Sequence, residues 1–465
     1  MPRMTENTHQ NQQHVFRAYD IRGVVDEDFD ESWVIRLGKA CASFFLQRGQ
    51  QTVVVGYDCR MSSPGYSRAL IEGIVSVGAH VVCIGMVPTP FVYFAVKHLG
   101  LAAGVMVTAS HNPHEYNGFK IWSGETTLAG AEIQTIRALM DDGLVAAGRG
   151  LVSELDIFPA YRDAVCRRIR FARPVSVVLD GGNGAGGEFC RELLTCLGAK
   201  VIPLYCEPDG RFPNHHPDPV VEANLADLKA AVSAGGADIG IGLDGDADRI
   251  GVVDENGRFY FGDEILALYA RDVLTRMPGA RIIGDVKCSH RLFKDIADHG
   301  GTAEMYATGH SLIKARMLET GAALAGEMSG HMFFREGWYG FDDGLFAAAR
   351  LVALLAASAV PFSRMLCWPP GAVTPEIQMD CPDADKMSVV DRAKAYFRDR
   401  YDMVAIDGVR LVFPDGWGLV RASNTQPALV LRFEAVNEQR LAEIRSILET
   451  PLRSWVDEAV RKRCL

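Results

Sequence analysis

The chain has 465 residues, more than one hydrophobic core usually serves, so its length favours about three or four domains. Hydrophobic residues make up 48% of the sequence and charged residues 23%, which is ordinary for a soluble globular protein. The formal net charge of −10 argues against nucleic acid or an anionic membrane as a partner, although a local basic pocket could still bind a small anion.

The cysteines and the amino terminus indicate the compartment. The 11 cysteines are odd in number and form no C-x-x-C pair, so neither a disulfide framework nor a zinc site is expected. Residues 1–14 are polar and contain no apolar signal region. The most apolar segment, residues 345–360, is only 16 residues long and contains Arg350, which predicts a buried helix instead of a membrane span. We therefore expect a cytoplasmic protein.

Three units of one pattern follow each other along the chain. Each unit has an apolar strand, a helix, a second strand that begins with Gly, and a third strand that ends in a polar loop. The third strands with their loops are residues 102–113, 237–249 and 322–331. Short apolar strands that alternate with helices predict α/β domains whose sheets are covered on both faces. Because ligands bind at the carboxyl ends of such strands, we expect the three loops to meet in one cleft.

The repeated pattern stops after about residue 364. Pro369, Pro370 and Pro375 mark a connector, and the alternating strands and two helices beyond it predict a smaller α+β domain. The predicted domains are residues 1–152, 153–255, 256–366 and 367–465.

An acidic loop follows the third strand of the second unit. Asp244, Asp246 and Asp248 stand at every second position, and carboxylates this close repel one another unless a cation or protons intervene. Oxygen ligands suit Mg²⁺ or Ca²⁺ better than zinc, so we interpret the loop as a metal site and not as a solvated turn. We reject an EF-hand, because Arg249 occupies the position where that loop needs Gly and the flanking segments are strand-like.

Two further loops have compositions that suit phosphate binding. Gly182, Gly184 and Gly187, with Glu207 further on, match a dinucleotide fingerprint, but a lone match is weak and is typical of a tight strand-to-helix turn. The segment RASNTQP could cradle a phosphate between two strands, although a polar hairpin turn has the same composition. Its candidate ligands are Arg421, Ser423, Asn424 and Thr425.

Ser110 lies in the segment TASHNP, after the third strand of the first unit. A serine hydrolase is one alternative, but on an extended strand His111 would point to the opposite face, and no G-x-S-x-G motif surrounds Ser110. A serine that carries a phosphoryl group needs a nearby cation, basic side chains and an anchor for the substrate. The acidic loop and the RASNT segment offer the first and the last, and the basic candidates are Arg22, Lys120 and Arg249.

Seven segments together resemble the α-D-phosphohexomutase superfamily, and most closely its bacterial phosphomannomutase/phosphoglucomutase branch. They occur in the family order and span nearly the whole chain: YDIRG from Tyr19, TASHNP from Thr108, NGFK from Asn117, DGDADR from Asp244, TGH from Thr308, GEMSGH from Gly326 and RASNTQP from Arg421. The resemblance implies an α/β fold with three related domains of mixed sheets and a smaller α+β domain at the carboxyl terminus, all around one central cleft.

The resemblance also implies roles for individual residues. Ser110 would be the phosphoserine, and one of its phosphoryl oxygens would hold a single Mg²⁺ ion together with Asp244, Asp246 and Asp248. Lys120 and His331 would be candidates for proton transfer, and Glu327 and Ser329 would bind sugar hydroxyls. The other contacts to the substrate or its phosphates would come from Tyr19, Arg22, Arg249, Lys287, Thr308, Gly309, His310, Arg421, Ser423, Asn424 and Thr425.

The activity implied by the resemblance is the interconversion of hexose 1-phosphate and hexose 6-phosphate, for mannose, glucose or both. Phospho-Ser110 would phosphorylate the sugar, a 1,6-bisphosphate would turn over in the cleft, and the other phosphate would return to Ser110. Closure of the C-terminal domain on its Pro-rich connector would exclude water. Alternatives are a phosphoglucosamine mutase, a phosphatase and a non-catalytic sugar-phosphate sensor. We expect sugar phosphates as partners, with no nucleic acid or membrane, and a monomer or weak homodimer.

Overall fold

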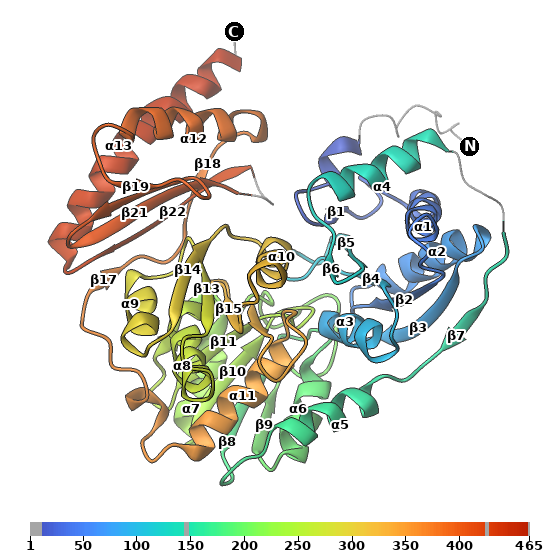
Figure 1. The fold of residues 1–465 in the computed structure, drawn as a ribbon, viewed down its shortest axis with the longest axis horizontal. Coiled ribbons are helices and arrows are strands. Elements are labelled where there is room, and N and C mark those ends of the chain that lie inside the picture. The colour runs from blue at the N-terminus through green and yellow to red at the C-terminus, as the bar shows by residue number, and fades with distance from the viewer. Residues whose placement is uncertain (1–11, 144–147, 424–426, 464–465) are drawn as a thin grey trace.

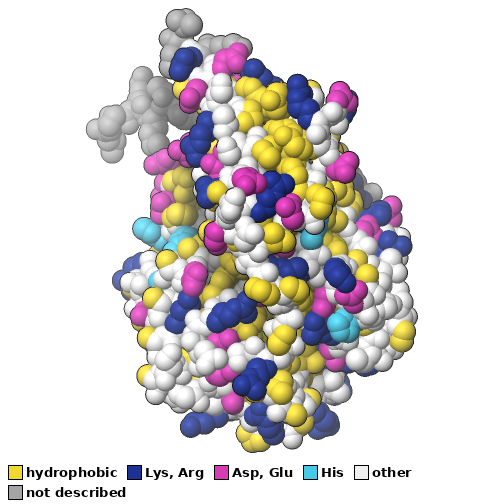
Figure 2. Space-filling view, turned by 90° about the vertical axis from the view of Figure 1, so that its left-hand side faces the viewer, with side chains coloured by type: hydrophobic (Ala, Val, Ile, Leu, Met, Phe, Trp, Pro, Cys, Tyr) yellow, Lys and Arg dark blue, Asp and Glu magenta, His cyan; other side chains and the backbone are white. Residues whose placement is uncertain are grey.

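The computed structural model describes residues 12–143, 148–423 and 427–463, which fold into four sheets with their helices (Figure 1). The predicted fold class, three related α/β domains followed by a smaller α+β domain, is confirmed. Among the described residues, no helix is both long and apolar enough to span a membrane. On the face that Figure 2 shows, Lys and Arg side chains are interspersed with Asp and Glu, so neither sign of charge dominates it.

The first sheet follows the order β1-β5-β4-β2-β3-β7, with β6 beside β5. Its strands are β1 (Ile21–Val24), β2 (Thr52–Tyr57), β3 (His80–Met86), β4 (Ala103–Val107), β5 (Tyr116–Ser123), β6 (Thr126–Thr127) and β7 (Val152–Glu154). The helices of this domain are η1 (Gln12–Val15), α1 (Glu31–Leu46), α2 (Ser63–Ser76), α3 (Thr89–His98) and α4 (Ala131–Asp142). Because β7 pairs with β3, the first sheet continues past residue 152 to Glu154.

The second sheet, β12-β11-β10-β8-β9, and the third, β14-β13-β15-β16, follow along the chain. Their strands are β8 (Ser176–Asp180), β9 (Lys200–Leu204), β10 (Ile239–Leu243), β11 (Ile250–Asp254), β12 (Phe259–Tyr260), β13 (Arg281–Asp285), β14 (Thr302–Tyr306), β15 (Leu324–Gly326) and β16 (Met332–Phe334). Their helices are α5 (Phe158–Arg168), α6 (Gly187–Cys196), η2 (Glu222–Leu225), α7 (Ala226–Gly235), α8 (Gly262–Arg276), α9 (His290–Asp298), α10 (His310–Thr320), α11 (Gly344–Ala357) and η3 (Phe362–Arg364).

One topology recurs in these three sheets, which confirms the predicted repeat. In each, the first strand of the unit (β2, β8 or β13) pairs in parallel with the second and the third strand. The third strand (β4, β10 or β15) then pairs antiparallel with the strand that follows its loop, so the sheets are mixed. The loops after β4, β10 and β15 therefore occupy equivalent positions.

The C-terminal domain is an antiparallel sheet, β17-β22-β21-β20-β19, with β18 beside β22. Its strands are β17 (Ala372–Val373), β18 (Ile377–Asp380), β19 (Met403–Val404), β20 (Val409–Phe413), β21 (Gly416–Ala422) and β22 (Ala428–Ala435), and its helices are α12 (Asp383–Phe397) and α13 (Glu438–Arg463). Both helices pack against this sheet (Figure 1) and bury a core that includes Phe397, Leu431 and Leu448.

One hydrophobic cluster continues through the first three domains, beside further clusters within each of them. Phe94 of α3 contacts Tyr161 of α5, and both rings meet Trp338, which stacks on Phe346 of α11. Helix α11 is the predicted buried helix, and the Asp343 carboxylate caps it by accepting from the N–H of Phe346. The first three domains thus share a core, whereas the C-terminal domain has its own.

Candidate active site

A cleft of about 910 Å³ opens where the loops after β4, β10 and β15 face the C-terminal domain. The predicted site residues that line it are Tyr19, Arg22, Ser110, Lys120, Arg249, Lys287, Thr308, Gly309, His310, Glu327, Ser329, His331, Arg421 and Ser423. Asp244, Asp246 and Asp248 are fully buried behind these residues. Asp244 contacts Ser110, and Asp246 and Asp248 contact Lys120. Asn424 and Thr425 lie outside the described residues.

Ser110 sits in a turn that buried groups hold in shape. Its φ of 51° lies in the left-handed region, which residues other than Gly rarely adopt. The guanidinium of Arg60 has no exposed surface and donates to the carbonyl oxygens of Ser110 at 2.7 Å and Asn112 at 2.6 Å. The hydroxyl of Thr108 accepts from the Ser110 N–H at 2.9 Å. Such a strained turn persists only where its surroundings fix it, so the direction of the Ser110 hydroxyl is set by the fold.

The expectation that His111 points away from Ser110 is wrong. It assumed an extended chain, and the positive φ of Ser110 instead brings the His111 Nδ1 to 3.3 Å from the Ser110 Oγ. Asp244 is nearer, because its Oδ2 accepts from the Ser110 hydroxyl at 2.7 Å. Burial lowers the pKa of His111 well below its usual value, and Arg249 and Arg22 add to this effect. The Ser110 hydroxyl is therefore nearer to Asp244 of the acidic loop than to His111.

The acidic loop forms the floor of the cleft. Asp244, Asp246 and Asp248 follow β10 directly, and none has exposed surface. The ammonium of Lys120 lies 2.7 Å from Asp246 Oδ2 and 2.5 Å from Asp248 Oδ2, and the Thr89 hydroxyl donates to Asp246 at 2.5 Å. Since Lys120 and Thr89 belong to the first domain, the loop is held by two domains at once.

Two oxygens of the acidic loop lack partners and fit a cation. Oδ1 of Asp246 and Oδ1 of Asp248 are buried without a hydrogen-bond partner among the described residues, and ligand oxygens of the three aspartates lie within 4.8 Å of one another. Burial raises the pKa of Asp244 to about 7 against the opposing cation of Arg249, and the neighbouring carboxylates add to the rise. A hard divalent cation would satisfy the free oxygens and offset this repulsion.

The glycine loop of the second unit packs against the acidic loop. A Cβ on Gly184 would lie 2.7 Å from the carbonyl oxygen of Gly245, and a Cβ on Gly245 would lie 2.4 Å from the carbonyl oxygen of Ser110. These glycines allow three backbone segments to approach closely. Close packing therefore accounts for Gly184 without a dinucleotide.

Arg249 is held by a residue that the sequence analysis did not single out. Its Nε lies 3.0 Å from Asp244, and its Nη1 lies 3.2 Å from Asp218, which lines the cleft beside His216. Both residues belong to the segment PNHHPDP, residues 213–219. Two histidines and an aspartate between prolines were a usable signal, because such a segment combines a rigid backbone with titratable side chains.

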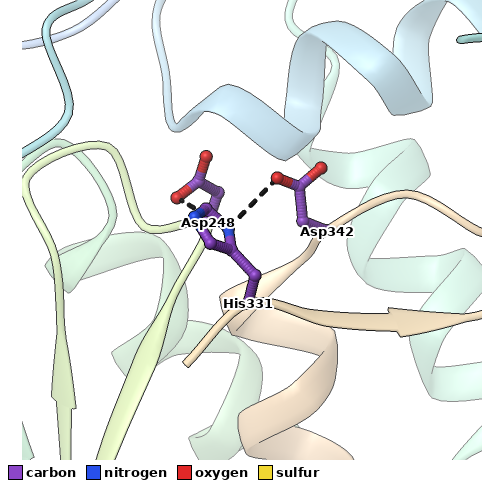
Figure 3. Close-up of side chains that lie close together, drawn as sticks. All are labelled: Asp248, His331 and Asp342. Atoms are coloured by element: carbon purple, nitrogen blue, oxygen red, sulfur yellow. Dashed lines mark ion pairs between the residues drawn. The ribbon is translucent and has the colours of Figure 1, made fainter. Parts of the chain in front are cut away.

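His331 lies between carboxylates from two loops (Figure 3). Its Nδ1 is 3.2 Å from Asp342 Oδ2 and 3.5 Å from Asp248 Oδ1. Burial disfavours the imidazolium, but Asp248, Asp342 and Glu327 outweigh burial and raise the pKa of His331. An isolated β-bridge between Arg249 and His331 also joins the acidic loop to the loop after β15.

The trio Asp248, His331 and Asp342 has ligand atoms within 4.8 Å of one another, so it could also hold a metal ion. Positive charge is already present, however. Lys120 lies 2.5 Å from Asp248, and Lys314 lies 2.7 Å from Asp342. A metal ion in the trio would have to displace Lys314 from Asp342 and would share Asp248 with the acidic loop, so the trio suits a protonated histidine better.

Glu327 ties the loop after β15 to the start of α10. It is buried at 2% exposure, and its Oε1 accepts from the N–H of Gly309 at 2.5 Å. Burial raises the pKa of Glu327, and the cations of His331 and Lys287 oppose the rise. Ser329 lies on the same loop and also lines the cleft. A carboxylate and a hydroxyl side by side can bind the hydroxyl groups of a sugar.

Lys287 meets the C-terminal domain at Glu376. Its Nζ lies 2.5 Å from Glu376 Oε1 and 3.8 Å from Asp285 Oδ2. Burial disfavours the ammonium, but Glu376 and Asp285 outweigh burial and raise the pKa of Lys287. Glu376 lines the cleft and was missed, because a single glutamate in a connector carries no sequence signal.

Arg421, at the end of β21, is held by Asp407. The Arg421 Nε lies 2.8 Å from Asp407 Oδ2, and the same oxygen accepts from the N–H of Thr308 at 3.1 Å. Asp407, also missed, therefore bridges the third and fourth domains. The Arg421 Nη2 is buried without a hydrogen-bond partner among the described residues, so it can still bind an anion.

Arg22 and Tyr19 complete the wall beside Ser110. The guanidinium of Arg22 donates to Asp20 and to the Asn112 amide oxygen, each at 2.6 Å, and its Nε has no partner among the described residues. Burial raises the pKa of Tyr19 to about 12, with Asp20 adding to the rise, and its ring stands edge-on to His310 at 5.0 Å. Arg22 is thus a cation available to a phosphate.

Comparison with known proteins identifies the family. Residues 13–144, 160–257 and 261–370 match the alpha/beta/alpha domains I, II and III of phosphoglucomutase/phosphomannomutase, and residues 376–449 match its C-terminal domain. The chain belongs to this family. The suspected membership of the phosphohexomutase superfamily is therefore confirmed.

Three relatives show how similar the family members are. A phosphomannomutase/phosphoglucomutase of Pseudomonas aeruginosa is 46% identical over 445 residues, 95% of this chain and 96% of that protein. A probable phosphoglucosamine mutase of Methanothermobacter thermautotrophicus is 36% identical over 436 residues, 92% of this chain and 95% of that protein. The crystal structure of a phosphoglucomutase/phosphomannomutase family protein from Burkholderia thailandensis, 41% identical, superposes with a TM-score of 0.90 over 95% of this chain and 98% of that chain.

Proposed function

We propose that this chain is a phosphohexomutase that interconverts hexose 1-phosphate and hexose 6-phosphate through phospho-Ser110 and a hexose 1,6-bisphosphate. The observation that carries the proposal is the hydrogen bond of 2.7 Å from the Ser110 hydroxyl to Asp244, at the floor of a cleft of about 910 Å³. A serine beside a cation site and basic side chains is suited to carry a phosphoryl group. The name of the 46% identical relative supports the same activity.

The acidic loop would hold one Mg²⁺ ion. Oδ1 of Asp246 and Oδ1 of Asp248, which have no hydrogen-bond partner among the residues that the structure describes, would join Asp244 and a phosphoryl oxygen on Ser110 as the hard ligands that this cation prefers. When bound, the cation neutralises charge on the transferred phosphoryl group. A phosphate on Ser110 would also remove the hydroxyl proton that Ser110 now donates to Asp244.

In the first transfer, a sugar hydroxyl oxygen bonds to phosphorus while the bond from phosphorus to the Ser110 Oγ breaks. Arg22 and Arg249 lie beside Ser110 and would bind the equatorial oxygens of the phosphoryl group. The proton of the sugar hydroxyl is released and one is taken up by the Ser110 Oγ, and Lys120 and His331 are the candidates to move them. The bisphosphate then turns over and returns its other phosphoryl group to Ser110.

Glu327 and Ser329 would bind the sugar hydroxyls during both transfers. Such contacts to the 3- and 4-hydroxyls do not separate mannose from glucose, which differ at carbon 2, so we infer activity on both. Arg421, Ser423, Asn424 and Thr425 would hold the phosphate that is not reacting, and the remaining wall of Tyr19, Lys287, Thr308, Gly309 and His310 would complete the site. Phosphoglucosamine is the second candidate substrate, supported by the 36% identical relative. The cytoplasmic location and the monomeric or weakly dimeric state stay predictions.

Intact-mass measurement and kinetics test the proposal. We expect a phosphate-sized adduct that maps to Ser110, and a Ser110→Ala variant that folds normally but loses on the order of 10⁴-fold or more in kcat. Assays with mannose, glucose and glucosamine 1-phosphates identify the substrate. Stoichiometric release of inorganic phosphate would instead indicate a phosphatase, binding without any phosphoserine would indicate a sensor, and wild-type turnover by Ser110→Ala would refute the proposal.

A further inference from the structure

Lys314 is a buried lysine that the proposed function does not use. It lies on α10, one helical turn after His310, and is 2% exposed. Helix α10 occupies the middle of the molecule, between the first and the C-terminal domains (Figure 1), and its Ser311 hydroxyl lies 2.6 Å from the Thr127 hydroxyl of the first domain. Burial of an ammonium costs free energy unless specific partners repay it, so its contacts indicate its role.

The contacts of Lys314 are an acceptor carboxylate and an imidazole. Its Nζ lies 2.7 Å from Asp342 Oδ1 and 3.1 Å from the His310 Nδ1, and it faces the Tyr93 ring at 4.6 Å. Burial lowers the pKa of Lys314, but the ion pair with Asp342 opposes burial and favours the ammonium form, which has three N–H donors and no acceptor. Because the ammonium can only donate, the His310 Nδ1 that it contacts has to offer a bare lone pair. Asp342 Oδ2 lies 3.6 Å from the same nitrogen, too far to accept a hydrogen bond from it.

The other nitrogen of His310 then has to carry the ring proton. His310 Nε2 is buried without a hydrogen-bond partner among the described residues, and the side chain lines the cleft. Burial and the cations of Lys314 and Lys120 lower the pKa of His310 well below its usual value, although Asp342 opposes them, and this favours the neutral ring. In a neutral imidazole, one nitrogen donates and the other accepts.

We propose that Lys314 is a positioning residue that fixes His310 as the Nε2–H tautomer, and so makes His310 a hydrogen-bond donor to an oxygen of the bound substrate. His310 then cannot take a proton from a sugar hydroxyl through Nε2, which leaves Lys120 and His331 as the candidates for proton transfer. The identity of the acceptor, a sugar or phosphate oxygen, rests on the proposed function. The tautomer itself does not.

The tautomer is measured directly by two-bond ¹H–¹⁵N correlation spectra of the full-length protein with ¹⁵N-labelled histidine, in which the protonated and the bare ring nitrogen give different patterns. A His310→Asn variant assigns the signals among the 12 histidines. We expect a neutral ring with the proton on Nε2 in the wild-type protein. A proton on Nδ1, or an even mixture, would overturn the inference without any variant having to fold.

Two substitutions test the role of Lys314. Lys314→Met removes the donor and should produce a mixture of tautomers, whereas Lys314→Gln keeps an N–H donor and should preserve Nε2–H. Arg316→Met is the matched control, because Arg316 lies on the same helix and pairs with Glu304 at 2.6 Å. An unchanged tautomer in Lys314→Met would contradict the positioning role.

Kinetics separate this inference from the proposed function. For a mutase, Lys314→Met should raise KM about tenfold with a smaller change in kcat, because one hydrogen bond to bound substrate is lost, and Lys314→Gln should restore most of it. An Nε2–H ring in a protein without mutase turnover would leave this inference standing and refute the proposed function. An Nδ1–H ring in a protein with mutase turnover would refute this inference and leave the proposed function standing.

Discussion

The two ends of the cleft hold their charges in different ways. At the Ser110 end, Asp246 and Asp248 are fully buried and share Lys120, which comes from another domain within one continuous hydrophobic core. At the far end, Arg421 is held by Asp407 in a domain with a core of its own.

This difference matches the two tasks that the cleft would perform. Phosphoryl transfer needs charges that do not move between the ground state and the transition state. The far end has to release one phosphate and accept the other when the bisphosphate turns over. Charges on a separately folded domain can follow that motion, whereas charges built into a shared core cannot.

The largest expected effect comes from a substitution in the acidic loop, at the Ser110 end of the cleft. Asp246→Asn removes a proposed cation ligand and one partner of Lys120, so kcat should fall by about 10²–10³-fold. Turnover at saturating Mg²⁺, with cation binding measured by calorimetry, checks this. The control is Asp227→Asn, an exposed aspartate of the same domain that should behave as wild type. Full activity of Asp246→Asn would mean that the acidic loop is structural.

A substitution at the Arg421 end of the cleft should change KM and leave kcat nearly unchanged. Arg421→Ala removes the guanidinium whose Nη2 has no hydrogen-bond partner within the described part of the chain, so KM for the sugar phosphate should rise about 10–100-fold while kcat changes little. Steady-state kinetics with Arg440→Ala as control, an arginine that pairs with Asp415 in the same domain, test the prediction. A loss confined to kcat would show that the two ends do not divide the work in this way.

A smaller effect in the opposite direction is expected at Glu376. Its carboxylate lies 2.5 Å from the Lys287 Nζ, so a substrate phosphate has to compete for that ammonium. Glu376→Gln should therefore lower KM by about threefold to tenfold. Lys287→Met in the same assay should raise KM, and if both variants raise it, the Lys287–Glu376 pair is needed as a unit when substrate binds.

The smallest effect concerns pH and metal removal. The pKa of Asp244 is raised from 3.8 to about 7, so its protonated form stabilises the metal-free protein below about pH 4, and that contribution is lost as the pH rises through 7. Chelated protein should show a Tm that falls by a few degrees between pH 5 and pH 8. Asp244→Asn, or saturating Mg²⁺, should remove this slope, and cation affinity should weaken below pH 7. A slope that persists in Asp244→Asn has another origin.

Some features of the site could be read from spacing along the chain. The repeated third strands predicted that Ser110, Asp244 and Glu327 would lie at equivalent strand ends. The structure places Ser110 and Glu327 in the wall of one cleft, with Asp244 buried behind Ser110 and hydrogen-bonded to it. The position of His111 was predicted wrongly, because the left-handed φ of Ser110 depends on Arg60, about 50 residues away in the chain.

The sequence by itself determined the repeat, the order of the loops, the family and the chemical types at the site, because strand periodicity and short motifs are local properties. Only the tertiary structure decided which charges meet. Asp407, Glu376 and Lys314 are single charged residues without a motif, and their importance arises from contacts with Arg421, Lys287 and His310. Such pairs depend on how the folded chain places side chains that no motif links, and burial then makes each pairing matter energetically.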